Sequence, residues 1–140
     1  MVEIIDASGL IMGRLSTHVA KKLLKNRDLE VAIINSEKAI VSGNRKMVLK
    51  NYIRKRELNH PRKGPYFPRM PDRILKRTIR GMLPYQQDRG RNALKRVKVY
   101  IGTPEEFRGK KAASVEEAKN EGIEQYIELA EISKVLGAKI

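Results

Sequence analysis

Four basic residues near the middle of the chain share one face of a predicted helix. At helical spacing, residues 72–83 bring within an arc of about 100° the side chains of Arg73, Lys76, Arg77 and Arg80. The opposite side of this helix holds Ile74, Leu75, Thr78, Ile79 and Met82. Because the apolar side must be buried, we expect the cations to form an outward row with neighbours about 5–6 Å apart, a spacing that suits successive phosphate groups. The alternative is a solvated charged face, but such faces usually mix signs, and no acidic residue follows Asp72 in this helix.

The segment before this helix, NHPRKGPYFPRMP (59–71), combines cations with aromatic residues. Its four prolines and one glycine argue against a helix or a central strand and predict a long, ordered loop. The loop carries the cations Arg62, Lys63 and Arg69. Its aromatic residues, Tyr66 and Phe67, could stack on unpaired bases or fasten the loop to the core, and the sequence leaves both open.

Further cations extend the candidate surface on both sides of the loop and helix. They are Arg54, Lys55, Arg56, Arg89, Arg91, Lys95 and Arg96. Residues 45–98 hold eighteen Lys and Arg against three Asp and Glu, whereas residues 1–44 have a net charge of +1 and residues 99–140 of −2. The whole excess of +14 therefore lies in the middle of the chain, which favours a polyanionic partner, most often nucleic acid.

Other kinds of chemistry lack support in the residues. The chain has no cysteine, which excludes disulfides, thiolate metal sites and cysteine nucleophiles and is typical of an intracellular protein. His18 and His60 stand alone and predict no metal cluster. No G-x-S-x-G elbow is present. We therefore expect no enzyme activity, no cofactor, no metal and no small-molecule substrate.

The chain also gives no sign of membrane association. No apolar run approaches the roughly 18 residues that a spanning helix needs, and the N-terminus lacks the pattern of a signal peptide. We expect a protein without membrane contact.

The turn DASGLIMG (6–13) raises one alternative, a nucleotide site. A P-loop requires G-x-x-x-x-G-K-[ST], but here the spacing is one residue short and Arg14 and Leu15 follow Gly13. The dinucleotide fingerprint G-x-G-x-x-G is missing too. We expect Gly9 to permit a tight turn and Gly13 to let helix and sheet approach closely. Asp6 could be a catalytic carboxylate at a strand end, but a capping or turn role fits better because no partner accompanies it.

The elements that would position these residues follow from hydrophobic periodicity. Strands are expected at 2–6, 31–35 and 98–101 with a brief one at 39–43, and helices at 12–26, 44–56, 72–83 and 130–137. The buried strands and the helix between the first two predict a βαβ unit with a parallel sheet. We expect a single α/β domain over residues 1–140, with the basic segment 45–98 inside it.

Several stretches resemble one known family. They are DASGLIMGRLSTHVAKKLL (6–24), INSEKAIVSG (34–43), GPYFPRMPDRILKRTIRGMLPYQQDRGRNALKRVKVYIGTP (64–104) and the final SKVLGA. Together they closely resemble the large-subunit ribosomal proteins numbered thirteen, and RGMLP followed by RG and a KVYIG strand is highly specific. The loop PRKGPYFPRMP stands where bacterial members carry an H-S-G-Y-P-G-like sequence, so the chain looks archaeal in type.

The resemblance implies a three-layer α/β/α fold around a mostly parallel sheet. It also implies a structural role in the cytoplasmic large (50S) ribosomal subunit, contact with 23S-type rRNA and neighbouring ribosomal proteins, and a part in early assembly. Weak or no autonomous rRNA binding is typical of the bacterial relatives. Two alternatives stay open at this point: a translational regulator that binds messenger RNA outside the ribosome, and a small nucleotide-binding enzyme that uses the 6–14 turn.

Overall fold

The computed structural model describes most of the chain. The described residues are 2–58, 62, 64 and 66–139. Of the predicted loop at 59–71, residues 59–61, 63 and 65 lie outside the described residues, and with them His60 and Lys63.

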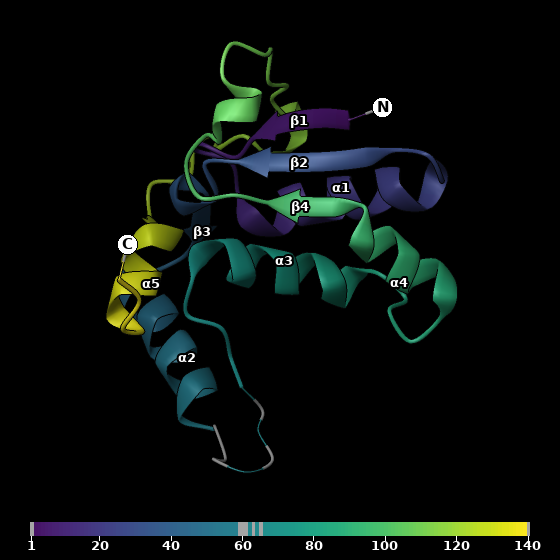
Figure 1. Cartoon of the computed structure of the whole chain (residues 1–140). Coiled ribbons are helices and arrows are strands. Elements are labelled where there is room, and N and C mark those ends of the chain that lie inside the picture. The colour runs from purple at the N-terminus through teal and green to yellow at the C-terminus, as the bar shows by residue number, and fades with distance from the viewer. Residues whose placement is uncertain (1, 59–61, 63, 65, 140) are drawn as a thin grey trace.

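A parallel sheet of three strands forms the centre of the fold (Figure 1). Its strands are β1 (Val2–Asp6), β2 (Glu30–Ile34) and β4 (Val97–Val99), in the order β1-β2-β4. The central strand pairs in parallel with both neighbours, and four of its five residues are buried, as its nearly unbroken apolar sequence predicts. The predicted α/β class, with a mostly parallel sheet flanked by helices, is confirmed.

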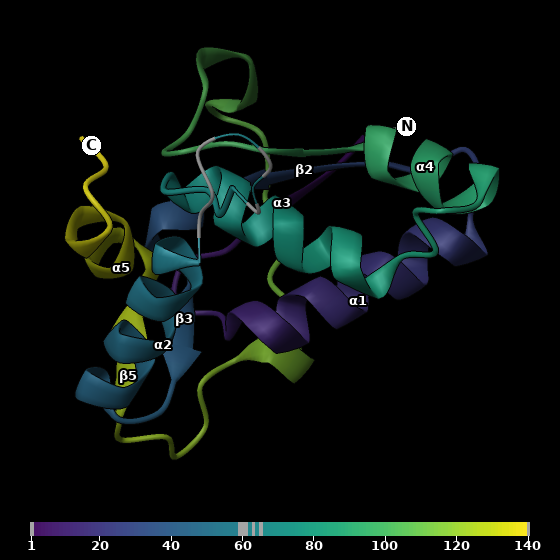
Figure 2. The same cartoon turned by 90° about the horizontal axis from the view of Figure 1, so that it is seen from below.

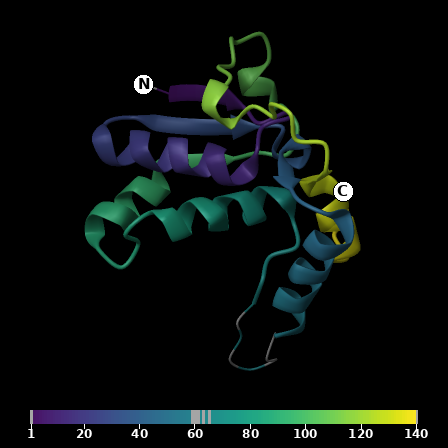
Figure 3. The same cartoon turned by 180° about the vertical axis from the view of Figure 1, so that it is seen from behind.

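Two long helices lie side by side against this sheet, as Figures 2 and 3 show. The first, α1 (Met12–Lys25), connects β1 to β2 and buries Leu15, Val19 and Leu23. The second, α3 (Pro71–Met82), contacts both α1 and β4. It begins with a proline at its first position, where the fixed φ suits a helix and the missing N–H costs nothing. Both helices were predicted within one or two residues.

A second group of elements packs at one end of the sheet. Strands β3 (Ile40–Ser42) and β5 (Tyr126–Glu128) form an antiparallel pair. Helix α2 (Arg45–Glu57) follows β3 and projects away from the sheet in Figure 1, and α5 (Leu129–Val135) follows β5. The Asn44 side chain caps α2 by accepting a 2.9 Å hydrogen bond from the Lys46 amide. The sequence predicted all of these elements except β5.

Helix α4 (Asp88–Lys95) was not predicted, and it depends on a glycine. A Cβ atom at Gly90 would lie 2.0 Å from the Pro84 carbonyl oxygen, so only glycine allows α4 to pack on the turn that follows α3. Gly90 and Ala93 are its two buried residues. Because neither buried residue is a large apolar one, the helix shows only a weak hydrophobic period in the sequence.

The two faces of the sheet have different cover. Ile5, Val31, Ile33 and Val97 belong to a core cluster that extends along the chain as far as Leu136. The alternate residues of the same strands face the segment that contains the short 3-10 helix η2 (Glu105–Phe107), where Tyr100 and Phe107 lie 5.5 Å apart. Two further 3-10 turns, η1 (Ser36–Lys38) and η3 (Glu116–Ala118), complete the described elements. Helices therefore cover the core face, and a loop covers much of the other.

Candidate nucleic-acid interface

The predicted row of cations lies along the outer side of α3. We call this set the α3 row: Arg73, Lys76, Arg77 and Arg80. Arg73 and Arg80 are exposed, whereas Lys76 and Arg77 are half-buried. All four border one hollow of about 280 Å³, together with Pro68 and Leu94.

Burial of the opposite side of α3 forces the row outward. Ile74, Leu75 and Ile79 are at most 1% exposed, so the helix cannot turn without exposing them to water. Thr78 is half-buried and donates a 3.0 Å hydrogen bond to the Ile74 carbonyl. Met82 was predicted on the same side; it lies in the last turn, where its sulfur accepts a 3.4 Å hydrogen bond from the Thr17 hydroxyl of α1, although the residue is 41% exposed. The fully buried side of α3 is therefore narrower than the sequence predicts, and the α3 row still lies on the outer side of the helix.

The cations of the α3 row form no ion pair with a carboxylate in the part of the chain that the structure describes. Among the described residues, the ion pairs join other groups, and none includes a member of the row. Asp72 precedes the row but makes no ion pair with it. A line of like charges without carboxylate partners attracts a polyanion from solution.

Phe67 fastens the loop to the body of the protein beneath the row. Its ring meets that of Tyr52 edge-on at 5.8 Å, and the Arg77 guanidinium lies 4.9 Å from its centre. Arg77 also donates a 3.1 Å hydrogen bond to the Tyr66 carbonyl. Tyr66 itself is 57% exposed. Of the two roles left open for this aromatic pair, Phe67 takes the structural one.

The cations before the loop lie at the end of α2. Arg54, Lys55 and Arg56 occupy its last turn, where positive charge is favourable to the helix dipole. The Lys55 ammonium lies 4.8 Å from the Tyr52 ring and 5.5 Å from Phe67. In the loop itself, Arg62 and Arg69 are exposed, and Lys63 lies outside the described residues.

The cations after α3 have more varied surroundings. Arg89 is exposed on α4. Arg91 forms an ion pair with Asp88 and also donates to the Gln86 carbonyl. Part of the charge on this side is therefore compensated within α4.

Arg96 is held by backbone carbonyls at the end of α1. Its guanidinium donates to the carbonyls of Leu23, Asn26 and Leu29 at 2.9, 2.6 and 3.1 Å. Carbonyls at a helix C-terminus lack hydrogen-bond donors within the helix, and the Arg96 guanidinium provides such donors. Its placement is thus that of a capping group for α1.

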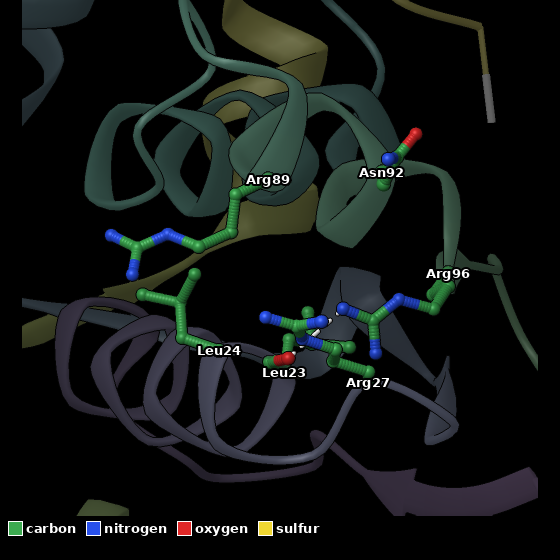
Figure 4. Close-up of a pocket in the computed structure, with 6 residues that line it drawn as sticks. All are labelled: Leu23, Leu24, Arg27, Arg89, Asn92 and Arg96. Atoms are coloured by element: carbon green, nitrogen blue, oxygen red, sulfur yellow. Dashed lines mark hydrogen bonds between the residues drawn. The ribbon is translucent and has the colours of Figure 1, made fainter.

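Figure 4 shows the hollow around this arginine, between α1 and α4. It measures about 430 Å³, and Arg89 extends over Leu24 while Arg96 reaches to the Leu23 carbonyl. Arg27 also lines it. Sequence reasoning missed Arg27 because it lies in the first part of the chain, where the charges nearly balance. Its position after a predicted helix, close to two other cations, could be found only from the fold.

Comparison with known proteins decides the family. The family model described as Ribosomal protein L13 matches residues 1–106, which include the α3 row and α4. The chain belongs to this family.

Relatives cover nearly the whole of this ribosomal protein L13 family member. A protein of Methanosarcina barkeri named large ribosomal subunit protein uL13 is 50% identical over 138 residues, or 97% of this chain and 98% of the relative. Proteins of the same name from Archaeoglobus fulgidus and Methanocaldococcus jannaschii are 45% and 46% identical. They cover 96% and 97% of this chain, and 86% and 98% of their own lengths are matched. The resemblance read from the residues, including its archaeal character, is confirmed.

The glycine turn of this family member has a structural role. Asp6 accepts hydrogen bonds from the Ser8 amide at 2.9 Å and from Asn35 Nδ2 at 3.1 Å. Partial burial acts to raise the pKa of Asp6, but these hydrogen bonds and the charge of Lys38 outweigh it, so the pKa lies below its ordinary value. The turn role that the sequence favoured for Asp6 is therefore confirmed.

The two glycines of this turn differ. Gly9 has a φ of +71°, which favours glycine, as the predicted tight turn requires. The predicted close approach at Gly13 is wrong, because a Cβ atom there would meet nothing within 4 Å. The spacing of the two glycines thus reflects one turn and not a phosphate loop.

The described residues also hold no group of three or more His, Asp or Glu side chains arranged for a metal ion. His18 was expected to be a surface residue. Its side chain is 25% exposed, and its Nδ1 atom lies 3.9 Å from a carboxylate oxygen of Glu117. No described helix has both the length and the apolar character that crossing a membrane requires.

Proposed function

We propose that this chain is a structural, non-catalytic constituent of the large ribosomal subunit in the cytoplasm, and that its basic surface binds the large rRNA. The proposal takes the subunit from the names of the relatives and the mode of binding from the α3 row. The observation that carries it is the line of four cations without carboxylate partners among the described residues.

Contact with RNA through this row would be mainly electrostatic. Arginine offers a planar fork of donors that matches two phosphate oxygens, and each neutralised phosphate releases a counterion. The sequence contains no motif of a recognition module that reads bases. The surface would therefore hold rRNA by its backbone and shape, and its affinity would fall steeply as salt rises.

The proposed RNA-binding set extends beyond the row to the cations and the tyrosine around it. It comprises Arg54, Lys55, Arg56, Arg62, Lys63, Tyr66, Arg69, Arg73, Lys76, Arg77, Arg80, Arg89, Arg91 and Arg96. Within this set we expect the largest contribution from the α3 row and the smallest from Arg91 and Arg96, whose guanidinium groups already have partners in the protein.

Neighbouring ribosomal proteins are the second class of proposed partner. The end of the chain is acidic, and its exposed carboxylates include Glu121 and Glu124 before β5 and Glu128 at the end of β5. Carboxylates repel RNA phosphates and attract cations. The acidic segment would therefore suit contact with a basic protein and not with RNA. We further propose, from the family, that the chain joins the subunit early in assembly.

Charge reversal on α3 tests the proposal. We expect the triple variant Arg73→Glu, Lys76→Glu, Arg80→Glu to be lost from large subunits, because phosphate attraction becomes repulsion. Arg77 is kept, since it supports Phe67. The measurement is the fraction of the chain that sediments with large subunits in a cell lysate.

The matched control reverses three other exposed cations: Arg108→Glu, Lys110→Glu and Lys111→Glu, which lie in the loop after η2. It should enter subunits nearly as well as the unchanged chain. Circular dichroism would verify that both variants fold. Equal incorporation of the two folded variants would contradict the assignment of the α3 row.

A further inference from the structure

A larger hollow opens beside the α3 row. It measures about 610 Å³ and lies between the loop residues that precede α3 and the turn that ends α5. Arg73 and Pro68 border both this hollow and that of the row, so the two hollows are adjacent. Its volume falls in the range of about 300–1,000 Å³ that is usual for sites of small ligands.

The far wall of the hollow comes from the last described residues. Helix α5 ends in a Schellman motif, in which the Gly137 and Ala138 amides donate to the carbonyls of Lys134 and Ser133 at 3.1 and 2.9 Å. Gly137 has a φ of +96°, which favours glycine at this position. The motif turns the chain so that Lys139 lines the hollow with Arg69. Figure 2 shows this part of the chain leaving α5.

Arg69 lies across this turn. A Cβ atom at Gly137 would be 3.6 Å from the Arg69 guanidinium nitrogen, which is contact distance. The charges that line the hollow are those of Arg69, Arg73 and Lys139, and no carboxylate is among its described lining residues. The hollow is therefore complementary to an anion.

An aromatic ring completes the hollow. Tyr66 lines it and is 57% exposed, whereas its neighbour Phe67 is half-buried against Tyr52 and Arg77. Gly64, with a φ of +73°, lets the Tyr66 ring lie close to the backbone: a Cβ atom there would be 3.0 Å from two ring carbons. Exposed aromatic rings stack on unpaired bases without regard to sequence.

We propose that this hollow receives a single unpaired nucleotide of RNA, which stacks on Tyr66 while Arg69, Arg73 and Lys139 bind the adjoining phosphates. The inference rests on the proposed function, because the nucleotide would belong to the RNA that the α3 row holds. A regular duplex keeps its bases stacked within it and could contact the row without filling the hollow. The site thus selects a bulge, a loop or a flipped base beside a helix.

Ultraviolet cross-linking of large subunits that contain the chain tests the site directly. We expect the peptide that carries Tyr66 to cross-link to one rRNA nucleotide, and mass spectrometry and primer extension to place that nucleotide in an unpaired position. A cross-link to a paired nucleotide or to a protein, or no cross-link of Tyr66 at all, would overturn the inference. Loss of the chain from subunits would instead count against both the inference and the proposed function.

Titration of the full-length chain with two RNA hairpins, alike except for one bulged nucleotide, gives a second readout. We expect the bulged hairpin to bind about tenfold more tightly, as one base stack predicts, and Tyr66→Phe to keep this preference. Tyr66→Ala should abolish the preference, so that the two hairpins bind equally. Tyr126→Ala, the same change at another exposed tyrosine on β5, should leave both affinities unchanged.

The outcomes separate the two proposals. Equal affinity of the unchanged chain for both hairpins, or a preference that survives in Tyr66→Ala, would overturn the nucleotide site and leave the α3 row standing. If the chain binds neither hairpin, the cross-linking result decides the inference by itself.

Discussion

Helices α1 and α3 lie against each other and each buries one apolar side, yet their polar sides have different surroundings. On α1, the Lys22 ammonium lies 2.6 Å from Glu3 of β1, and His18 lies 3.9 Å from Glu117 of η3. On α3, no member of the row forms an ion pair among the described residues. The period of apolar residues decides which side of a helix faces outward. Carboxylates from distant parts of the chain neutralise some of the outward charge of α1, whereas within the described part of the chain they leave the α3 row unpaired.

The largest effect is expected from a substitution on the inner side of α3, whose burial turns the row of cations outward. Ile79 is completely buried, so Ile79→Ala should lower the free energy of unfolding by about 2–5 kcal/mol. The exposed Ile53 on α2 offers a control, because Ile53→Ala removes the same atoms from a side chain that is 38% exposed. Urea unfolding of both variants measures the difference. Similar losses at the two positions would contradict the burial that turns the row outward.

A smaller effect should separate the outer sides of the two helices. Replacing Arg73 and Arg80 by glutamine should weaken RNA binding and reduce the slope of log affinity against log salt by about 0.7–0.9 for each lost phosphate contact. Replacing Lys21 and Lys25 of α1 by glutamine removes the same charge from the neighbouring helix. We expect that control to keep the slope, measured by titration of structured RNA at several salt concentrations. Equal slopes for the two double variants would mean that net charge, and not the row, governs binding.

The smallest effect concerns the turn that leads into α1. Because the pKa of folded Asp6 lies below its ordinary value of 3.8, ionised Asp6 stabilises the fold at pH values above the unfolded pKa. This contribution is lost as the pH falls through the folded pKa. Asp6→Asn should therefore be less stable than the unchanged chain near neutral pH, and the difference should shrink under acid conditions. Urea midpoints measured from about pH 6 to pH 2 check this sign, and a constant difference would contradict it.

The sequence was sufficient for most of the fold because the long elements have clear periods. Strand β5 was missed because only Ile127 of its three residues is buried, and its partner β3 lies far upstream in the chain. Helix α4 was missed because its buried residues are Gly90 and Ala93. In both cases the element is stabilised by contacts with distant residues and not by its own pattern.

The candidate site divides in the same way. The α3 row could be predicted because one helix supplies all of it. The roles of Tyr66 and Phe67 could not be separated, since the choice depends on Tyr52 of α2. Lys139 was missed because the last part of the chain is acidic overall, and only the Schellman turn at Gly137 brings it to Arg69. That the predicted residues bind rRNA stays a prediction until the experiments above are done.

The carbonyl cluster around Arg96 has a practical consequence for alanine scanning. A scan that scores every basic residue by subunit yield would count Arg96 as a strong hit, because truncation removes the donor to three carbonyls between the last turn of α1 and the start of β2. Most of the loss would come from a loosened junction between α1 and β2, and little of it from lost contact with rRNA. A thermal melt beside each variant tells such a false positive from a true contact.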